Sequence, residues 1–248
     1  MTALLEVRGL TRRFGGLVAT NALDLDVVEG EVHGLIGPNG AGKTTAIAQL
    51  AGELMPDAGV IRFAGAEITG LAPAARVRLG LARSFQITQL LPEFTALENL
   101  AMVFQVRAGH SFHFWKAAGS DRRFADPARG MLARMGLAER ADVPGGDLAH
   151  GEQRQLELAM ALATGARLLL LDEPMAGLGA AETQAMTRLL ASLRGMYTIL
   201  MVEHDMDAVF ALADRVTVLV QGAVLASGAP AAIRADPAVR AAYLGEDA

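Results

Sequence analysis

The chain has 248 residues, enough for one α/β domain that carries a subdomain. Its 22 Lys and Arg residues are outnumbered by 27 Asp and Glu residues, which argues against a broad nucleic-acid-binding surface, and the absence of cysteine excludes disulfides, zinc–thiolate sites and cysteine nucleophiles. Hydrophobic residues make up 52% of the chain, yet the longest uncharged stretch, 216–233, contains glycine, serine and proline and so predicts strands and turns rather than a membrane-spanning helix. Residues 1–13 contain no apolar run long enough for a signal peptide, and we expect a cytoplasmic chain.

Short strands and one helix are predicted for the first sixty residues. Apolar and acidic residues alternate over 23–27 with the period of a half-buried strand, and the apolar run 31–37 predicts a strand that leads into a glycine-rich turn. A helix should begin at about Lys43 and stop at Gly52. Residues 59–63 predict another strand.

Residues 88–164 predict a helical insertion. Capping patterns indicate two helix starts there, at Thr95–Glu98 and at Asp126–Pro127, and a third helix should begin close to Gly151. The second of these helices should end near Gly136.

Strands and helices alternate again after the insertion. Residues 167–171 and 198–202 are apolar enough for strands buried on both faces of a parallel sheet, and 181–195 predict a helix between them. A hairpin should begin at Thr217, and a last helix is expected from Asp236–Pro237 to Gly245.

A phosphate-binding pattern, G-x4-G-K-[ST], is present at residues 37–44, between a predicted strand and a predicted helix as the motif requires. Its glycines let backbone N–H groups turn toward phosphate oxygens, and the helix N-terminus adds a partial positive charge. Lys43 would reach the β- and γ-phosphates, and the Thr44 hydroxyl would bind Mg²⁺. The pattern therefore predicts a nucleoside triphosphate bound with Mg²⁺.

Two carboxylates follow a run of four leucines. Asp172 and Glu173 would lie at the carboxyl end of a buried strand, the edge at which parallel sheets bind ligands, although a solvated turn would carry the same residues. Asp172 would hold Mg²⁺ through water, and Glu173 would act as general base on an attacking water. His204 follows another predicted strand and should lie at the same edge.

Three residues are ambiguous when each is considered alone. His204 could be a satisfied structural histidine, and Gln86 is uninformative. Phe14 could stack on a nucleobase or belong to the core.

Taken together, and in this order, these residues resemble the ATP-binding subunits of ABC transporters over nearly the whole chain. The resemblance implies an α/β fold, with a P-loop NTPase core of ABC-ATPase type, an N-terminal antiparallel β portion and an inserted helical subdomain. It implies a single domain, with residues 1–87 and 165–248 as nucleotide-binding core and 88–164 as helical signature subdomain.

The resemblance also implies roles for individual residues, with ATP and Mg²⁺ as cofactors. ATP would be bound by Phe14, against adenine, and by the phosphate loop Gly37, Pro38, Asn39, Gly40, Ala41, Gly42, Lys43, Thr44 and Thr45. The implied catalytic residues are Lys43, Gln86, Glu173 and His204, and the implied Mg²⁺ residues are Thr44, Gln86 and Asp172. Gln86 would also link the metal to the membrane partner, and His204 would stabilise developing charge.

In this family, ATP lies between the phosphate loop of one subunit and the signature loop of its partner. Residues 148–153 stand at the signature position, where Ala149, Gly151 and Glu152 would contact the partner's ATP. Ala149 replaces the usual serine, and Gly179 replaces the usual Asp, Asn or Ser of the D-loop. The lost serine hydrogen bond costs about 1.5–3 kcal/mol, whereas the N–H of Gly151 and the helix N-terminus remain. We therefore expect a weakened partner site and faster hydrolysis at this chain's own site.

Longer matches indicate a subfamily. The runs ARSFQ, FTALENL, HGEQRQLELA and VEHDMDAVFALADRVTVL resemble the longer of the two paired ATPases of branched-chain amino-acid importers. This resemblance implies a heterodimer with a second ATPase subunit, contact with two membrane-spanning permease subunits, and an indirect link to a substrate-binding protein, with no nucleic-acid partner. It also implies a peripheral position at the cytoplasmic face of the inner membrane. The alternatives are a urea or short-amide importer, an ABC ATPase of DNA repair or translation, and a regulatory subunit that binds ATP without hydrolysis. The acidic net charge argues against the second, and the intact Glu173 and His204 against the third.

Aromatic residues cluster in the helical insertion, namely Phe104, Phe112, Phe114, Trp115 and Phe124. They fill the core of that subdomain or form a groove beside Gln86 that receives a short helix of the membrane subunit. His110 and His113 are interpreted as surface residues.

Overall fold

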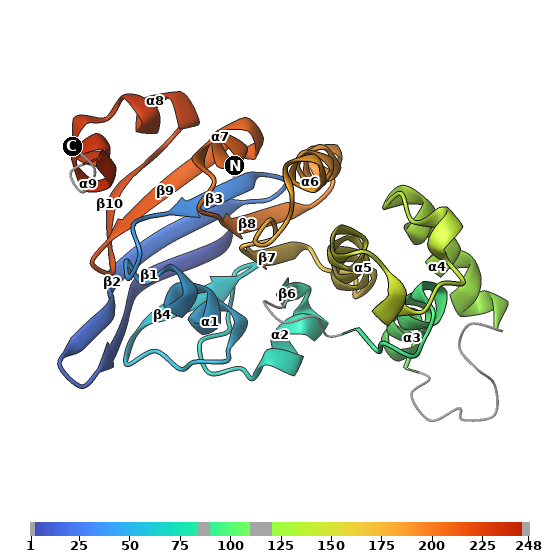
Figure 1. Cartoon of the computed structure of the whole chain (residues 1–248). Helices are drawn as coiled ribbons and strands as arrows, with labels where there is room; N and C mark the ends of the chain where they lie inside the picture. The colour runs from blue at the N-terminus through green and yellow to red at the C-terminus, as the bar shows by residue number, and fades with distance from the viewer. Residues whose placement is uncertain (1–2, 84–89, 110–120, 245–248) are drawn as a thin grey trace. The chain divides into compact units, whose positions relative to one another are not determined.

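The computed structural model of the chain describes residues 3–83, 90–109 and 121–244 (Figure 1). It divides into two compact units. The sheet unit comprises residues 1–83, 167–174 and 190–248, and the helical unit comprises residues 84–166 and 175–189. The helical unit contains the residues of the expected insertion and also the segment 175–189, which the family resemblance assigns to the nucleotide-binding core.

The larger sheet of the sheet unit has six strands, in the order β10 (Ala223–Gly228), β9 (Arg215–Val220), β3 (Val32–Ile36), β8 (Thr198–Val202), β7 (Leu168–Asp172) and β6 (Leu81–Arg83). All neighbours are parallel except β9 and β10, which form the predicted hairpin. Every residue of β3, β7 and β8 is buried, as expected for central strands covered on both faces. The predicted strands at 31–37, 167–171 and 198–202 are confirmed.

The smaller sheet has four antiparallel strands, in the order β2 (Leu17–Val28), β1 (Ala3–Phe14), β4 (Ala58–Phe63) and β5 (Ala66–Glu67). The predicted strands at 23–27 and 59–63 are parts of β2 and β4. Leu5 and Val7 of β1 are fully buried, whereas Arg8 is exposed, so one face of this sheet is apolar and the other is charged.

Helix α1 (Lys43–Ala51) lies between the two sheets (Figure 1). Its buried side chains, such as Ile47 and Leu50, share one core with apolar residues of both sheets. The helix ends at Gly52, whose φ of +82° confirms the predicted glycine stop. The other helices assigned to this unit are α2 (Pro73–Leu79), α7 (Met206–Leu212), α8 (Pro230–Ala235) and α9 (Pro237–Leu244). The start of α9 confirms the predicted last helix, and Gly245 lies outside the described residues.

The helical unit is built from α3 (Ala96–Arg107), α4 (Arg122–Arg134), α5 (His150–Ala163) and the first part of α6 (Ala180–Leu193), with 3-10 turns η2 (Ala138–Arg140) and η3 (Gly145–Asp147). The capping box that starts α3 is confirmed. The N–H of Glu98 donates to the Thr95 hydroxyl at 3.2 Å, and the N–H of Thr95 donates to the Glu98 carboxylate at 2.9 Å.

The predicted start of the second helix is wrong. Asp121, not Asp126, is the N-cap of α4, and it accepts a hydrogen bond from the N–H of Arg123 at 3.0 Å. Pro127 therefore lies inside the helix, at a cost of about 3 kcal/mol. The extra turn buries Phe124, which is 6% exposed, and burial of such a side chain contributes about 1.5–3 kcal/mol beside about 1 kcal/mol from the cap. Together these gains offset the cost of Pro127 inside the helix.

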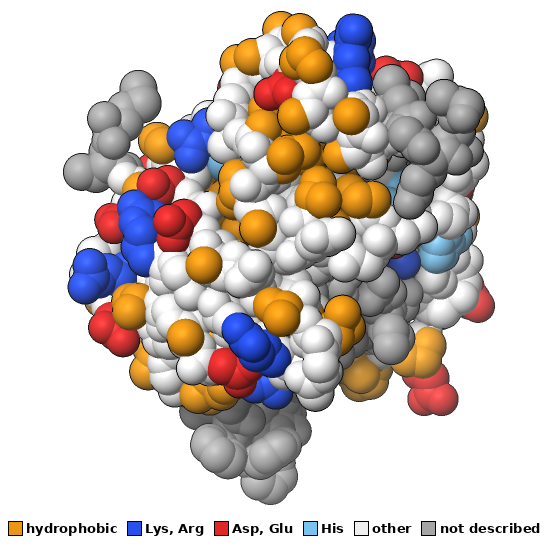
Figure 2. Space-filling model, turned by 90° about the vertical axis from the view of Figure 1, so that its left-hand side faces the viewer, with side chains coloured by type: hydrophobic (Ala, Val, Ile, Leu, Met, Phe, Trp, Pro, Cys, Tyr) orange, Lys and Arg blue, Asp and Glu red, His pale blue; other side chains and the backbone are white. Residues whose placement is uncertain are grey.

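The surface mixes charges of both signs. On the face shown in Figure 2, Lys and Arg side chains lie next to Asp and Glu side chains in several groups around a central set of hydrophobic side chains. Among residues 3–83, 90–109 and 121–244, no helix is both long and apolar enough to cross a membrane.

Candidate nucleotide-binding site

The predicted phosphate loop joins the end of β3 to the start of α1. It is pressed against its neighbours so closely that side chains are excluded at two positions. A Cβ on Gly42, whose φ is +98°, would lie 2.0 Å from the carbonyl oxygen of Ala19, and a Cβ on Gly37 would lie 2.2 Å from that of Leu219. The glycines of the motif are therefore required by packing as well as by the path of the loop.

Lys43 folds back over this loop. Its Nζ donates to the carbonyl oxygens of Gly37 at 2.7 Å and Pro38 at 3.0 Å, and the residue is 6% exposed. Burial lowers the pKa of Lys43, and the carboxylates of Glu173 and Asp172 oppose that shift. Among the residues that the structure describes, no carboxylate pairs directly with this ammonium group, and phosphate oxygens could replace the two carbonyls inside the loop.

Asp172, the last residue of β7, has a completely buried side chain. Its Oδ2 accepts a hydrogen bond from Nη2 of Arg83 at 2.7 Å, whereas Oδ1 is buried and has no hydrogen-bond partner among the described residues. Burial raises the pKa of Asp172, and Arg83 opposes the shift. An unpartnered buried carboxylate oxygen beside the phosphate loop fits a hydrated Mg²⁺. Arg83 stands within the run ARSFQ, but no sequence pattern indicated its contact with Asp172.

Glu173 and His204 are brought together at the same edge. Oε1 of Glu173 lies 2.7 Å from Nε2 of His204. The backbone of Glu173 has a φ of +53° and its N–H donates to the carbonyl oxygen of Val202 at 2.9 Å. A left-handed conformation costs a non-glycine residue about 1–2 kcal/mol, and such strain is concentrated at functional sites. The pair can activate a water molecule and stabilise the charge that develops on reaction.

Phe14 is not a core residue. It ends β1 and is 47% exposed. The guanidinium carbon of Arg12 lies 5.0 Å from the centre of its ring, and Nη1 of Arg12 donates to Oδ1 of Asp57 at 2.6 Å. The aromatic ring is thus supported by a cation while much of its surface remains open for stacking.

The signature loop, in the helical unit, precedes α5. Ala149 is the N-cap of this helix, and its N–H donates to Glu152 at 3.0 Å, whereas an alanine has no oxygen that could cap the helix in return. Glu152 also accepts a hydrogen bond from Arg140 at 2.8 Å, and this contact lowers the pKa of Glu152.

Glu182, in the first turn of α6, contacts both the signature loop and the D-loop. Its Oε1 accepts the N–H of Gly151 at 3.2 Å, and its Oε2 accepts the N–H of Gly179 at 2.9 Å. The amide of Gly151, expected to meet the partner's phosphate, is therefore bound to a carboxylate of its own chain. The spacing of Glu182 three residues after Gly179, typical of a helix cap, was the available signal.

Several predicted residues lie outside the described residues, namely Gln86, His110, Phe112, His113, Phe114 and Trp115. Of the other clustered aromatics, Phe104 is half-buried and Phe124 is buried in the helical unit, which favours the core alternative for Phe124.

A family model described as ABC transporter matches residues 20–176, and one described as branched-chain amino acid ATP-binding cassette transporter matches residues 223–248. The chain is 44% identical to the high-affinity branched-chain amino acid transport ATP-binding protein BraF of Pseudomonas aeruginosa and 42% identical to LivG of Escherichia coli, each over 98% of both chains. It also resembles a crystal structure of the ADP conformation of MJ1267, an ATP-binding cassette of an ABC transporter, with a TM-score of 0.87, 28% identity and coverage of 99% of this chain and 100% of that chain.

Proposed function

The chain belongs to the ABC transporter family of ATP-binding proteins and is an ATPase, and from this premise we propose that it drives an importer of branched-chain amino acids. The observation that carries the proposal is the likeness to BraF and LivG over 98% of the chain. The separate match of residues 223–248 to a branched-chain amino acid cassette model supports it. A Nod factor export protein of Burkholderia orbicola is 38% identical, but the match covers only 72% of that protein.

Nucleotide binding is assigned to the phosphate loop and its surroundings. Backbone N–H groups of the loop, with Lys43, would hold the phosphates, and the exposed ring of Phe14 would stack on the adenine. Thr44 and Asp172 would hold Mg²⁺, with Gln86 as a further ligand. When bound, Mg²⁺ neutralises charge on the phosphates.

Hydrolysis is assigned to the Glu173–His204 pair. Glu173 would accept a proton from the water that attacks the γ-phosphorus, releasing ADP and phosphate. His204, 2.7 Å from Glu173, would orient that carboxylate and stabilise negative charge on the γ-phosphate. Closure of a partner over the site would exclude water and strengthen these interactions.

The assembly is proposed to contain a second ATPase subunit, two membrane permease subunits and, indirectly, a substrate-binding protein. The chain would then lie at the cytoplasmic face of the membrane as a peripheral subunit. Because Ala149 cannot donate a side-chain hydrogen bond to the partner's ATP, hydrolysis should be faster at this chain's own phosphate loop.

The test is ATP hydrolysis by the complex reconstituted with both ATPases and the permease subunits. Leucine, isoleucine and valine, presented by the cognate binding protein, should stimulate hydrolysis, and a Glu173→Gln complex should not respond. Stimulation by urea or short amides alone would support the role as transport ATPase and change the proposed substrate. Basal hydrolysis without stimulation by any of these compounds would contradict the proposed import function.

A further inference from the structure

An arginine at the end of β6 reaches the carboxylate that ends the neighbouring strand β7. Nη2 of Arg83 donates to Oδ2 of Asp172 at 2.7 Å, and Nη1 donates to the carboxylate of Glu53. The Arg83 side chain is 11% exposed and that of Asp172 is fully buried. A buried carboxylate needs such a cation to remain ionised.

No other cation is bonded to Asp172 among the described residues. Lys43 is nearby, but its Nζ donates to two carbonyl oxygens of the phosphate loop. The charge of Asp172 is therefore balanced directly by Arg83, which is shared with Glu53.

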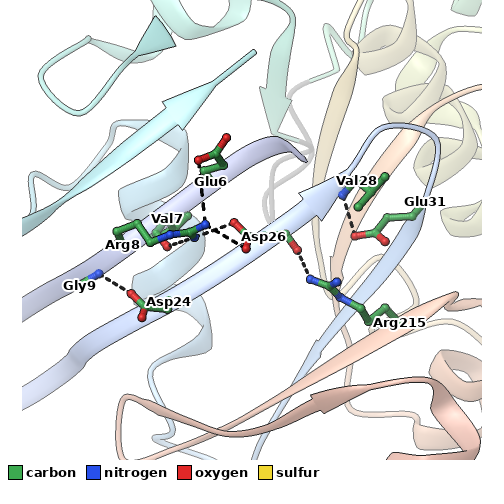
Figure 3. Close-up of polar contacts among 9 residues, drawn as sticks. All are labelled: Glu6, Val7, Arg8, Gly9, Asp24, Asp26, Val28, Glu31 and Arg215. Carbon is green, nitrogen blue, oxygen red and sulfur yellow. Dashed lines mark hydrogen bonds and ion pairs between the residues drawn. The ribbon is translucent and has the colours of Figure 1, made fainter. Parts of the chain in front are cut away.

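The geometry of the pair differs from that of a purely structural one in the same unit. Arg8 binds Asp26 with two parallel hydrogen bonds, of 2.6 and 3.0 Å, so that both carboxylate oxygens are occupied (Figure 3). Arg83 instead contacts one oxygen of Asp172 and directs its other terminal nitrogen to Glu53. Oδ1 of Asp172 is left buried and without a partner among the described residues.

We propose that Arg83 is a positioning residue, which holds Asp172 by Oδ2 so that Oδ1 faces the hydrated Mg²⁺ of the nucleotide. This inference rests on the proposed role of Asp172 in metal binding. Groups that orient a metal-binding carboxylate typically change metal affinity by about 10- to 100-fold when they are replaced. Arg83 touches neither nucleotide nor metal in this scheme, and nucleotide binding without Mg²⁺ should not depend on it.

The experiment measures equilibrium binding of a fluorescent ATP analogue to the purified full chain, first with EDTA and then across an Mg²⁺ titration. Arg83→Gln should raise the Mg²⁺ concentration at half-effect by about 10- to 100-fold and leave binding in EDTA within about twofold of wild type. Arg8→Gln, which removes the structural pair, should change neither value. Arg83→Lys keeps the charge but not the two-pronged geometry, and its Mg²⁺ requirement should fall between those of wild type and Arg83→Gln.

Three results would overturn the inference. The Mg²⁺ requirement of Arg83→Gln could be unchanged, it could fall because Arg83 competes with the cation, or binding in EDTA could weaken equally because the site is generally disturbed. If Arg83→Gln does not fold, as judged by circular dichroism, an Arg83→Lys requirement equal to wild type overturns it. A wild-type protein whose binding gains nothing from Mg²⁺ would instead reject the proposed metal role of Asp172 and the inference with it.

Discussion

A substitution at Arg76 tests how the C-terminal end of the phosphate-loop helix α1 is stabilised. Its side chain has no exposed surface and donates to four backbone oxygens, those of Leu71 at 2.9 Å, Gln49 at 2.8 Å, Leu50 at 2.7 Å and Thr69 at 2.8 Å. Two of these oxygens belong to the last turn of α1, and of the two the Gln49 carbonyl also accepts the N–H of Gly52 at 3.2 Å. Replacement of Arg76 by methionine keeps much of the volume and removes all of the donors.

Two opposing effects determine how far Arg76→Met lowers the free energy of unfolding. The Gln49 carbonyl keeps the N–H of Gly52, so the carbonyls of Leu50, Thr69 and Leu71 lose their donor, at a cost of about 2 kcal/mol each. Burial lowers the pKa of Arg76 to about 10, so removal of this poorly hydrated cation returns roughly 3 kcal/mol. The carbonyl groups dominate, and Arg76→Met should lower the free energy of unfolding by about 3 kcal/mol.

Urea unfolding followed by circular dichroism measures this change. Arg78→Met is the matched control, because Arg78 is exposed on the same helix and should alter the free energy of unfolding by no more than about 0.5 kcal/mol. A loss below about 1 kcal/mol for Arg76→Met, or equal losses for the two variants, would refute the reasoning.

Three further predictions concern α9 and the nucleotide site. Burial raises the pKa of Tyr243 to about 12, so in a Tyr197→Phe background the phenolate absorbance should rise with a midpoint near that value, and a midpoint near 10 would contradict the burial of Tyr243. The neutral phenol of Tyr243 stabilises the fold fully below about pH 10, and this stabilisation is lost as the pH passes the folded pKa. Glu173→Gln should reduce the ATP turnover number by about 100-fold or more while retaining ATP binding, and a turnover near wild type would exclude Glu173 as the base. Phe14→Ala should weaken ATP binding by about tenfold, whereas Leu17→Ala, at the paired exposed position on β2, should not, and equal effects would argue against stacking.

Local sequence signals predicted most of the helices and strands that form without contacts from distant parts of the chain. The five-residue strands β7 and β8 are continuous apolar runs, and the α3 capping box is complete within Thr95–Glu98. The short helices α2, α7 and α8 were missed, because helices of six or seven residues depend on tertiary contacts. For α2, one such contact is the bonding of Arg76 to the carbonyl oxygens of α1.

The candidate site likewise contains residues that local sequence predicts and residues that only tertiary contacts identify. The phosphate loop and the carboxylates could be predicted because each follows a recognisable strand. Arg83 could not, since it meets Asp172 across 89 residues of sequence and only the adjacency of β6 and β7 brings them together. Glu182 meets Gly151 across 31 residues, and a cap pattern alone does not identify the second amide that it binds.

Glu182 makes two loops depend on a single hydrogen-bond acceptor. The amides of Gly151 and Gly179 are each held by one oxygen of this carboxylate, so a rotation of one side chain leaves both amides free at once. The contact is also sterically sensitive, because a Cβ on Gly151 would lie 2.8 Å from Oε1 of Glu182. A methyl group added to the signature loop would therefore displace Glu182 and deprive the D-loop of its support, although no atom of the D-loop had been changed.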